Sequence, residues 1–225
     1  MKPMLVFDMD GVLVDTTASY RETIARTVEH FADVQVTPAQ IQDYKNQGGW
    51  NDDWKLSHHI IGRAGVNIEF ETVKQYFQEL FLGDGSNGMI LRERWVARAG
   101  VLERLMERFR LAVFTGRPKE DAALTLGRFS GGLLFDPVVG MYDVPRQKPA
   151  PDGLLQIARQ SGGAPAFYVG DTLDDARAAR AANVPFIGIA APANPRYLDL
   201  VFLFQGEGAH AILDDINYLE EVFER

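Results

Sequence analysis

The sequence predicts an α/β fold: a Rossmann-like, mostly parallel sheet with helices on both faces, interrupted near its start by an inserted all-α domain. Two observations lead to this prediction. Short apolar runs, typical of buried parallel strands, alternate along most of the chain with segments of helical periodicity. Between residues 16 and 88 this alternation stops, and only helical patterns are found.

The first expected strand covers Met4–Phe7 and ends directly before Asp8. Helices are expected between the strands. Val101, Leu105 and Phe109, for example, follow the i, i+4, i+8 spacing that places apolar side chains on one helix face. Further strands are expected at residues 111–114, 136–139, 166–169, 185–189 and 211–213.

The inserted segment is expected to form helices over residues 19–31, 38–46, 52–63 and 70–82. Thr37 followed by Pro38 is typical of a helix N-cap with proline at the first helical position. We therefore expect an α/β core of residues 1–15 and 89–225, and a helical domain of residues 16–88.

The overall composition narrows the classes of function. The 225 residues include 23 Lys and Arg against 31 Asp and Glu, and the net charge of −8 disfavours nucleic acid as a partner. The chain has no Cys, which excludes disulfides, thiolate metal sites and Cys nucleophiles. No apolar run is long enough to span a membrane and no targeting segment is visible, so a cytoplasmic location is expected.

Carboxylates stand at the ends of two expected strands, and ligands of open α/β sheets bind at these carboxyl ends. Asp8 and Asp10 follow the first strand, and Asp171 follows another. A divalent cation would relieve the repulsion between such groups, and Mg²⁺ prefers oxygen ligands. Asp8 and Asp171 therefore suit Mg²⁺, while Asp10 can keep a proton and act as a general acid. The alternative is that such residues only form turns or helix caps.

Two further strand ends carry groups that suit a phosphate. Thr115 and Gly116 stand between a strand and a helix, where a hydroxyl and free N–H groups favour an anion. Lys148 lies in a segment whose prolines restrict the backbone, which suits a lysine that must reach a fixed point. An ordinary N-cap and a solvated lysine are the alternatives. For Asp174 and Asp175, the alternative is a favourable place in a first helical turn.

Together, these residues resemble the motifs of the haloacid dehalogenase-like hydrolase superfamily. Its first motif, Asp-x-Asp-Gly, is matched from Asp8; a Thr after the second strand, a Lys and Gly-Asp-x-x-x-Asp then follow in the same order. The resemblance spans the whole chain. The helical insert is similar to the alpha-helical cap of the phosphoglycolate-phosphatase-like branch.

The resemblance implies a role for each matched residue. Asp8 is expected to be the nucleophile and to become an aspartyl phosphate. Asp10 is expected to protonate the leaving oxygen and then to activate the water that hydrolyses this intermediate. Thr115, Gly116 and Lys148 are expected to hold the phosphoryl group.

The resemblance also implies a Mg²⁺ site. Asp8, Asp171 and the main-chain carbonyl of Asp10 are expected to hold the ion. Asp175 matches the last acidic position of the family and is expected to support the site, while Asp174 falls where relatives carry Asn or another polar residue.

The expected activity is hydrolysis of a small phosphorylated metabolite. Dehalogenases of the family lack the second Asp of the first motif, and its phosphonate-cleaving branch has Ala there, so Asp10 argues against both. A His expected of β-phosphoglucomutase-like members is absent after Asp15 and Thr16. A mutase of that kind and a catalytically silent binding protein are the alternatives. A phosphorylation-switch receiver domain would be much shorter and would lack the insert.

Substrate specificity is expected to come from the insert, above all from residues 45–54, which are rich in polar, aromatic and glycine residues. Lys45 could bind a second anionic group, and Asn46, Asn51 and the tryptophans could contact a sugar or ring. Arg21 is a further candidate. Alternatively, this segment only links two helices, its tryptophans pack inside the helical domain, and Arg21 is solvated. The sequence does not indicate an oligomeric state.

Overall fold

The computed structural model describes residues 2–163 and 165–223. The chain divides into two compact units: the α/β unit, Met1–Val14 with Trp95–Arg225, and the helical unit, Asp15–Arg94. The helical unit begins one residue earlier than expected and extends to Arg94 instead of ending at residue 88.

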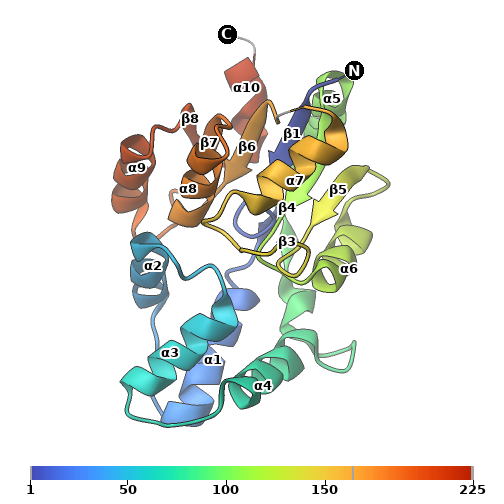
Figure 1. Cartoon of the computed structure of the whole chain (residues 1–225). Helices are drawn as coiled ribbons and strands as arrows, with labels where there is room; N and C mark the ends of the chain where they lie inside the picture. Colours follow the sequence, from blue (N-terminus) through green and yellow to red (C-terminus); the bar gives the residue numbers. More distant parts are fainter. Residues whose placement is uncertain (1, 164, 224–225) are drawn as a thin grey trace. The chain divides into compact units, whose positions relative to one another are not determined.

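A parallel sheet forms the centre of the α/β unit (Figure 1). Its middle strand β1 (Met4–Phe7) pairs in parallel with β4 (Arg110–Phe114) on one side and with β6 (Phe167–Gly170) on the other. Among the described residues the strand order is β5-β4-β1-β6-β7-β8, and every ladder is parallel. The outer strands are β5 (Phe135–Val139), β7 (Phe186–Ile189) and β8 (Ala211–Leu213).

Side chains of β1 alternate between two apolar clusters, one on each face of the sheet. Leu5 and Phe7 belong to one cluster, and Met4 and Val6 to the other. Both faces are therefore buried, which explains why the strands are uninterrupted apolar runs. The first cluster includes residues of α5 (Val101–Arg108), α6 (Lys119–Phe129) and α10 (Leu219–Phe223); the second includes residues of α7 (Asp152–Ser161), α8 (Leu173–Ala181) and α9 (Tyr197–Gly206). The predicted α/β fold class is confirmed.

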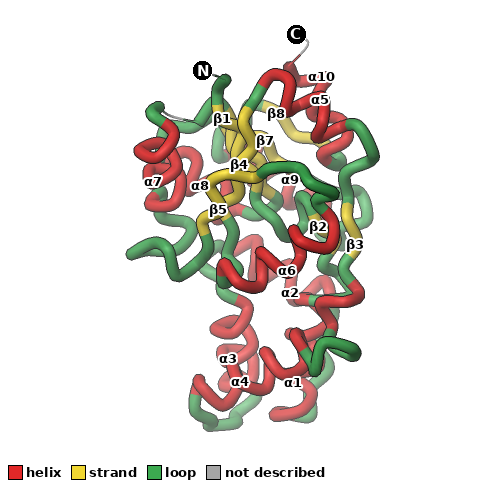
Figure 2. The backbone as a smooth tube through the Cα atoms, turned by 90° about the vertical axis from the view of Figure 1, so that its right-hand side faces the viewer, coloured by secondary structure: helices red, strands yellow, loops and turns green. Residues whose placement is uncertain are grey.

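The helical unit contains α1 (Tyr20–Ala32), α2 (Pro38–Gln47), α3 (Asp53–Arg63) and α4 (Phe70–Leu82), drawn in red in Figure 2. These helices lie within one residue of the expected bounds. Thr37 caps α2 as the sequence indicates, because its hydroxyl accepts a hydrogen bond from the Gln40 backbone N–H. Aromatic rings fill the interior, and the centroids of Tyr20 and Phe81 lie 4.0 Å apart.

The short elements at the unit boundary were not predicted. A 3₁₀ helix, η1 (Met89–Arg92), packs against α1 and α4, which explains why these residues belong to the helical unit. The strands β2 (Val14–Asp15) and β3 (Arg94–Trp95) pair with each other where the chain passes between the units. Two residues are too few to produce a periodicity that a sequence can reveal.

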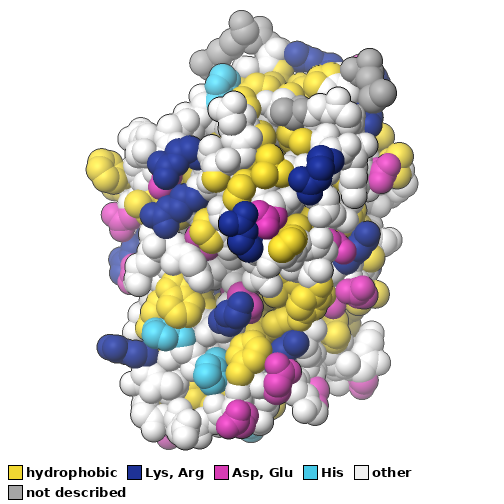
Figure 3. Space-filling model, viewed as in Figure 1, with side chains coloured by type: hydrophobic (Ala, Val, Ile, Leu, Met, Phe, Trp, Pro, Cys, Tyr) yellow, Lys and Arg dark blue, Asp and Glu magenta, His cyan; other side chains and the backbone are white. Residues whose placement is uncertain are grey.

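The surface shows no segregation of charge on the face drawn in Figure 3. There, Lys and Arg side chains of each unit are scattered among acidic ones. In the part of the chain that the structure describes, no helix combines the length and the apolar character that crossing a membrane requires.

Candidate active site

The carboxyl end of β1 delivers two acidic residues to a tight turn. The Asp8 backbone N–H donates to the Val169 carbonyl at 2.7 Å, so the β1–β6 ladder continues to the end of the strand. Gly11 follows with a φ of 71°, and a Cβ on this residue would lie 1.8 Å from Asp171 Oδ2. Only glycine therefore allows Asp171 to lie against the turn that follows Asp10.

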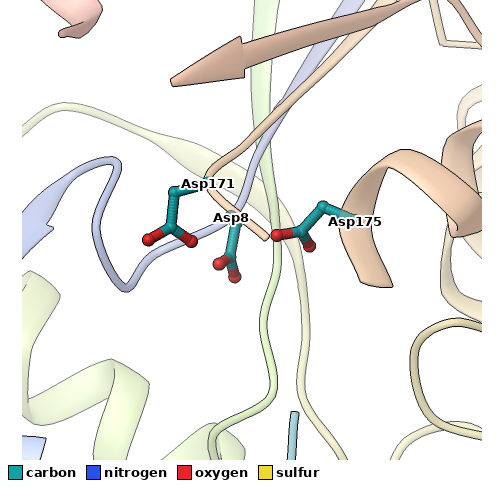
Figure 4. A group of neighbouring side chains, drawn as sticks. All are labelled: Asp8, Asp171 and Asp175. Atoms are coloured by element: carbon teal, nitrogen blue, oxygen red, sulfur yellow. The ribbon is translucent and has the colours of Figure 1, made fainter. Parts of the chain in front are cut away.

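Three carboxylates meet at this point. Asp8, Asp171 and Asp175 each place an oxygen within 4.8 Å of the others. Figure 4 shows Asp8 between the other two, with Asp175 pointing toward it from α8. Asp8 is 3% exposed and Asp175 is fully buried. Asp174, although also buried, does not belong to this cluster as the described residues define it.

Lys148 brings a buried cation to the carboxylates. Its Nζ donates to Asp8 Oδ1 at 2.8 Å, to Asp175 Oδ1 at 2.7 Å and to the Tyr168 hydroxyl at 2.9 Å. Burial disfavours its charge, but the carboxylates of Asp175 and Asp8 outweigh this effect and raise the pKa of Lys148. The charged form of Lys148 is therefore favoured next to Asp8.

Asp175 supports the site through a saturated set of hydrogen bonds. Its Oδ1 accepts from Lys148 and from the Tyr168 hydroxyl at 2.6 Å, and its Oδ2 accepts from the Thr172 N–H and hydroxyl at 3.0 and 2.6 Å. Burial acts to raise the pKa of Asp175, but Lys148 and these hydrogen bonds lower it below its usual value. Because both oxygens already accept hydrogen bonds, Asp175 fits a supporting role better than direct metal coordination.

The donor set fits a hard divalent cation. Carboxylate oxygens are the ligands that Mg²⁺ prefers, and Asp8 and Asp171 could coordinate it directly. Burial raises the pKa of the Asp8 carboxyl well above its usual range, although Lys148 acts to lower it. A bound dication would favour the ionised form that a nucleophile needs.

Thr115 lies at the carboxyl end of β4, as expected. It is 1% exposed, and its backbone N–H donates to the Val139 carbonyl at 3.0 Å. Its hydroxyl oxygen accepts from the Arg117 N–H at 3.2 Å, so the hydroxyl proton can still be donated to a ligand. Gly116 is the next residue of this turn, and α6 begins three residues later at Lys119.

Asp10 has a partner that the sequence analysis missed. Arg117 Nε donates to Asp10 Oδ1 and Oδ2 at 2.9 and 3.2 Å, and Nη2 donates to Oδ1 at 2.5 Å. The Arg117 side chain is 1% exposed, whereas that of Asp10 is 32% exposed. The sequence signal was an arginine directly after Thr115-Gly116 at a strand end. Tyr168 was missed as well, because it looks like any apolar residue of a strand.

The helical unit places Lys45 in an internal ion pair. Its Nζ donates to the Trp50 carbonyl at 2.8 Å and also contacts the Asp53 carboxylate. The Lys45 side chain is 11% exposed. Its charge is therefore already balanced inside the unit, which weakens the case for Lys45 as an anion-binding residue. Trp54 is buried, as the packing alternative supposes.

The remaining residues of the helical unit that were predicted to contact the substrate are Asn46, Asn51 and Arg21. Asn46 Oδ1 accepts from Gln42 Nε2 at 2.8 Å. Gln42 Oε1 and Asn51 Nδ2 are buried and have no hydrogen-bond partner among the residues that the structure describes. Arg21 lies half-buried in the first turn of α1. Contact of Asn46, Asn51 or Arg21 with a substrate stays a prediction.

Lys148→Met should destabilise the protein, because it leaves Asp8 and Asp175 buried without their cation. Removing one partner of a buried ion pair costs about 3–5 kcal/mol, and we expect the free energy of unfolding in urea to fall by about this amount. Arg146→Met is the matched control. Arg146 pairs with Asp152 at 2.7 Å in the same segment, but its side chain is 71% exposed, so little change is expected. Equal stability of Lys148→Met and the wild type would contradict this description of the site.

The chain matches one family model and is similar to several individual proteins. A family model for haloacid dehalogenase-like hydrolases matches residues 3–183. The chain is 28% identical over 228 aligned positions to a phosphoglycolate phosphatase of Pseudomonas putida, covering 96% of this chain and 78% of that protein. A crystal structure from Haemophilus somnus, described as a predicted phosphoglycolate phosphatase, superimposes with a TM-score of 0.78 at 19% identity and covers 99% of this chain and 98% of that one.

Another relative is a longer protein and is named as a dehydratase rather than as a phosphatase. The chain is 34% identical over 197 residues to an imidazoleglycerol-phosphate dehydratase of Phytophthora nicotianae. The match covers 84% of this chain but only 43% of the relative, so more than half of that protein lies outside the match. The chain likewise spans 66% of a phosphoglycolate phosphatase of Pseudomonas aeruginosa.

Proposed function

Because this chain belongs to the haloacid dehalogenase-like hydrolase family, we propose that it is a Mg²⁺-dependent phosphatase that hydrolyses a small phosphate monoester through an aspartyl-phosphate intermediate. One observation carries this proposal. The Asp8 carboxylate lies at a strand end between a buried lysine and a second carboxylate able to bind a cation. A nucleophile, a charge-neutralising group and a metal ligand are the parts that phosphoryl transfer requires.

In the first step, an oxygen of Asp8 attacks phosphorus and the bond from phosphorus to the leaving oxygen breaks. Asp10 gives its proton to the leaving oxygen. In the second step, Asp10 takes a proton from water, the water oxygen attacks phosphorus, and the bond from phosphorus to Asp8 breaks, releasing inorganic phosphate. Lys148 offsets the negative charge that gathers near Asp8 in both steps. When bound, Mg²⁺ supplies further positive charge against the phosphoryl oxygens.

Thr115 and Gly116 bind the phosphoryl group in this proposal. The Thr115 hydroxyl accepts its hydrogen bond from the Arg117 N–H and has a proton left to donate to a phosphoryl oxygen. These contacts concern the phosphate that all candidate substrates share. Discrimination between substrates therefore has to come from other residues, and we propose that the helical unit acts as the cap that supplies them.

Two substrate classes have support. The phosphatase relatives are named for phosphoglycolate, whose carboxylate would need a second cation. The more similar relative is named for a phosphate ester that carries an imidazole and a polyol. Asp53 already balances the charge of Lys45, which weakens the support for a second anionic group. A neutral imidazole offers one donor and one acceptor, and Gln42 Oε1 and Asn51 Nδ2 are a buried acceptor and a buried donor that no described residue pairs. We therefore rank the imidazole-bearing ester first.

The test compares phosphate release from imidazoleglycerol phosphate, glycerol phosphate and phosphoglycolate in the presence of Mg²⁺. Two hydrogen bonds at ~1 kcal/mol each correspond to about a thirtyfold preference for the imidazole ester over glycerol phosphate in kcat/KM. A preference for phosphoglycolate would reverse our ranking. Transfer of phosphate within a substrate without its release would favour the mutase alternative. Failure to act on any phosphate ester would favour the silent binding protein.

A further inference from the structure

Arg117 is a buried cation whose position has no explanation in the phosphate chemistry described above. It leaves the carboxyl end of β4 two residues after Thr115 and lies almost entirely inside the protein. Its Nη1 donates to the hydroxyl of Thr125 at 2.9 Å, and Thr125 is fully buried on α6. Its Nε and Nη2 donate to Asp10. The guanidinium is thus fixed on one side by α6 and binds the proposed proton-transfer residue on the other.

The contact with Asp10 is unequal between the two carboxylate oxygens. Among the described residues, Oδ1 accepts from both Nε and Nη2, whereas Oδ2 accepts from Nε at the longer distance of 3.2 Å. Oδ1 therefore holds the carboxylate in place. Oδ2 is the oxygen with more capacity left to exchange a proton with a leaving group or a water.

The two partners differ in how far they are buried. Asp10 is 32% exposed and can be solvated by water without an arginine. Arg117 is 1% exposed, and a buried guanidinium is costly unless its donors are satisfied. The guanidinium is a rigid, planar fork of donors whose geometry matches a carboxylate, so it can fix the orientation of the carboxylate that it binds. The arrangement suits the orientation of Asp10 more than the solvation of its charge.

We propose that Arg117 is a positioning residue for Asp10, which it holds with Oδ2 directed to the reacting oxygen. This inference rests on the proposed phosphatase function and concerns the proton-transfer residue of the same site. Arg117 acts through Asp10 and touches neither phosphorus nor the leaving group.

A double-mutant cycle tests this dependence. Arg117→Lys keeps the charge but loses the fork-shaped set of donors. Misplacement of a catalytic group by about 1 Å can cost ~10²-fold, so we expect kcat to fall by about 10–100-fold, with KM changed less than about twofold. In an Asp10→Asn background, the same replacement should change kcat less than about twofold, because the group that Arg117 positions is already disabled.

Single-turnover measurements make the slow Asp10→Asn background accessible, since loss of a general acid typically costs ~10²–10⁴-fold. An equal loss from Arg117→Lys in both backgrounds would overturn the proposal, because Arg117 would then act without Asp10. A raised KM with unchanged kcat would overturn it as well and would make Arg117 a substrate-binding residue. A wild-type kcat in the single variant Arg117→Lys would also overturn the proposal.

Thr125 supplies a second test in case Arg117→Lys does not fold. Thr125→Val removes the hydroxyl that accepts from Arg117 Nη1, and we expect kcat to fall severalfold in the wild-type background only. Thr125→Ser keeps the hydroxyl and should restore the rate. Arg128→Lys, at an exposed position of the same helix, is the control for α6 itself. Loss in both Thr125 variants, or in neither, would contradict the proposal. A wild-type protein inactive on all phosphate esters would instead remove the proposed function, and this inference with it.

Discussion

Asp8→Asn is expected to abolish phosphate release and to prevent formation of any phosphoenzyme. Asn has nearly the shape of Asp but cannot attack phosphorus, and no other carboxylate of the cluster stands at the end of β1. Removal of the nucleophile from a hydrolase that works through a covalent intermediate costs on the order of 10⁴-fold or more in kcat. Phosphate release gives the rate, and intact-protein mass spectrometry after an acid quench detects the phosphoenzyme.

Two controls test whether this loss of activity comes from the missing nucleophile and not from misfolding. The circular dichroism spectrum of Asp8→Asn should match that of the wild type. Asp215→Asn is the matched control, because Asp215 is half-buried in the α/β unit and its carboxylate accepts a hydrogen bond from the Asn217 N–H at 2.7 Å. We expect this variant to keep the wild-type rate. A phosphoenzyme in Asp8→Asn would assign the nucleophile to another residue.

The main elements of the fold follow from the sequence because burial on both faces leaves a simple signal. Met4–Phe7 is apolar throughout, since its alternate side chains enter two different clusters. The helices of the helical unit were also predictable, because α1 and α4 each bury a single face. The boundary was not predictable past residue 88, since only the packing of η1 against α1 and α4 assigns Met89–Arg92 to the helical unit.

The same reasoning separates the predictable from the unpredictable part of the site. Asp8, Lys148, Asp171 and Asp175 were expected together because parallel strands place their carboxyl ends at one edge of a sheet. The contacts that long side chains make could not be predicted from the sequence. The Arg117 guanidinium lies 107 positions from Asp10, and nothing local to either residue indicates their contact. The pairing of Lys45 with Asp53 on the next helix was unpredictable for the same reason, and a contact of Lys45 with substrate stays a prediction.

Removal of divalent cations is expected to reduce hydrolysis to background, and addition of Mg²⁺ should restore it. Asp8 and Asp171 lie in one cluster of carboxylates, and burial disfavours ionisation of Asp8 even with Lys148 beside it, so a divalent cation is needed to favour the ionised form. Phosphate release measured after EDTA treatment, and again with excess Mg²⁺, gives the result. Full activity in EDTA would refute the metal site. Ca²⁺ should replace Mg²⁺ poorly, because it takes more ligands at longer distances than two carboxylates and a carbonyl supply.

A thermal shift separates metal binding from catalysis. A ligand that binds only the folded state at about 100 times its Kd adds ~2.7 kcal/mol of stability, so Mg²⁺ should raise the Tm of the wild type by several degrees. The shift should disappear in Asp171→Asn, which loses a carboxylate ligand. It should persist in Asp174→Asn, because Asp174 lies outside the cluster. Gly11→Ala should also weaken the shift, since its Cβ would collide with Asp171 Oδ2 at 1.8 Å, whereas Gly127→Ala meets nothing within 4 Å. A shift that persists in Asp171→Asn would place the cation elsewhere in the protein.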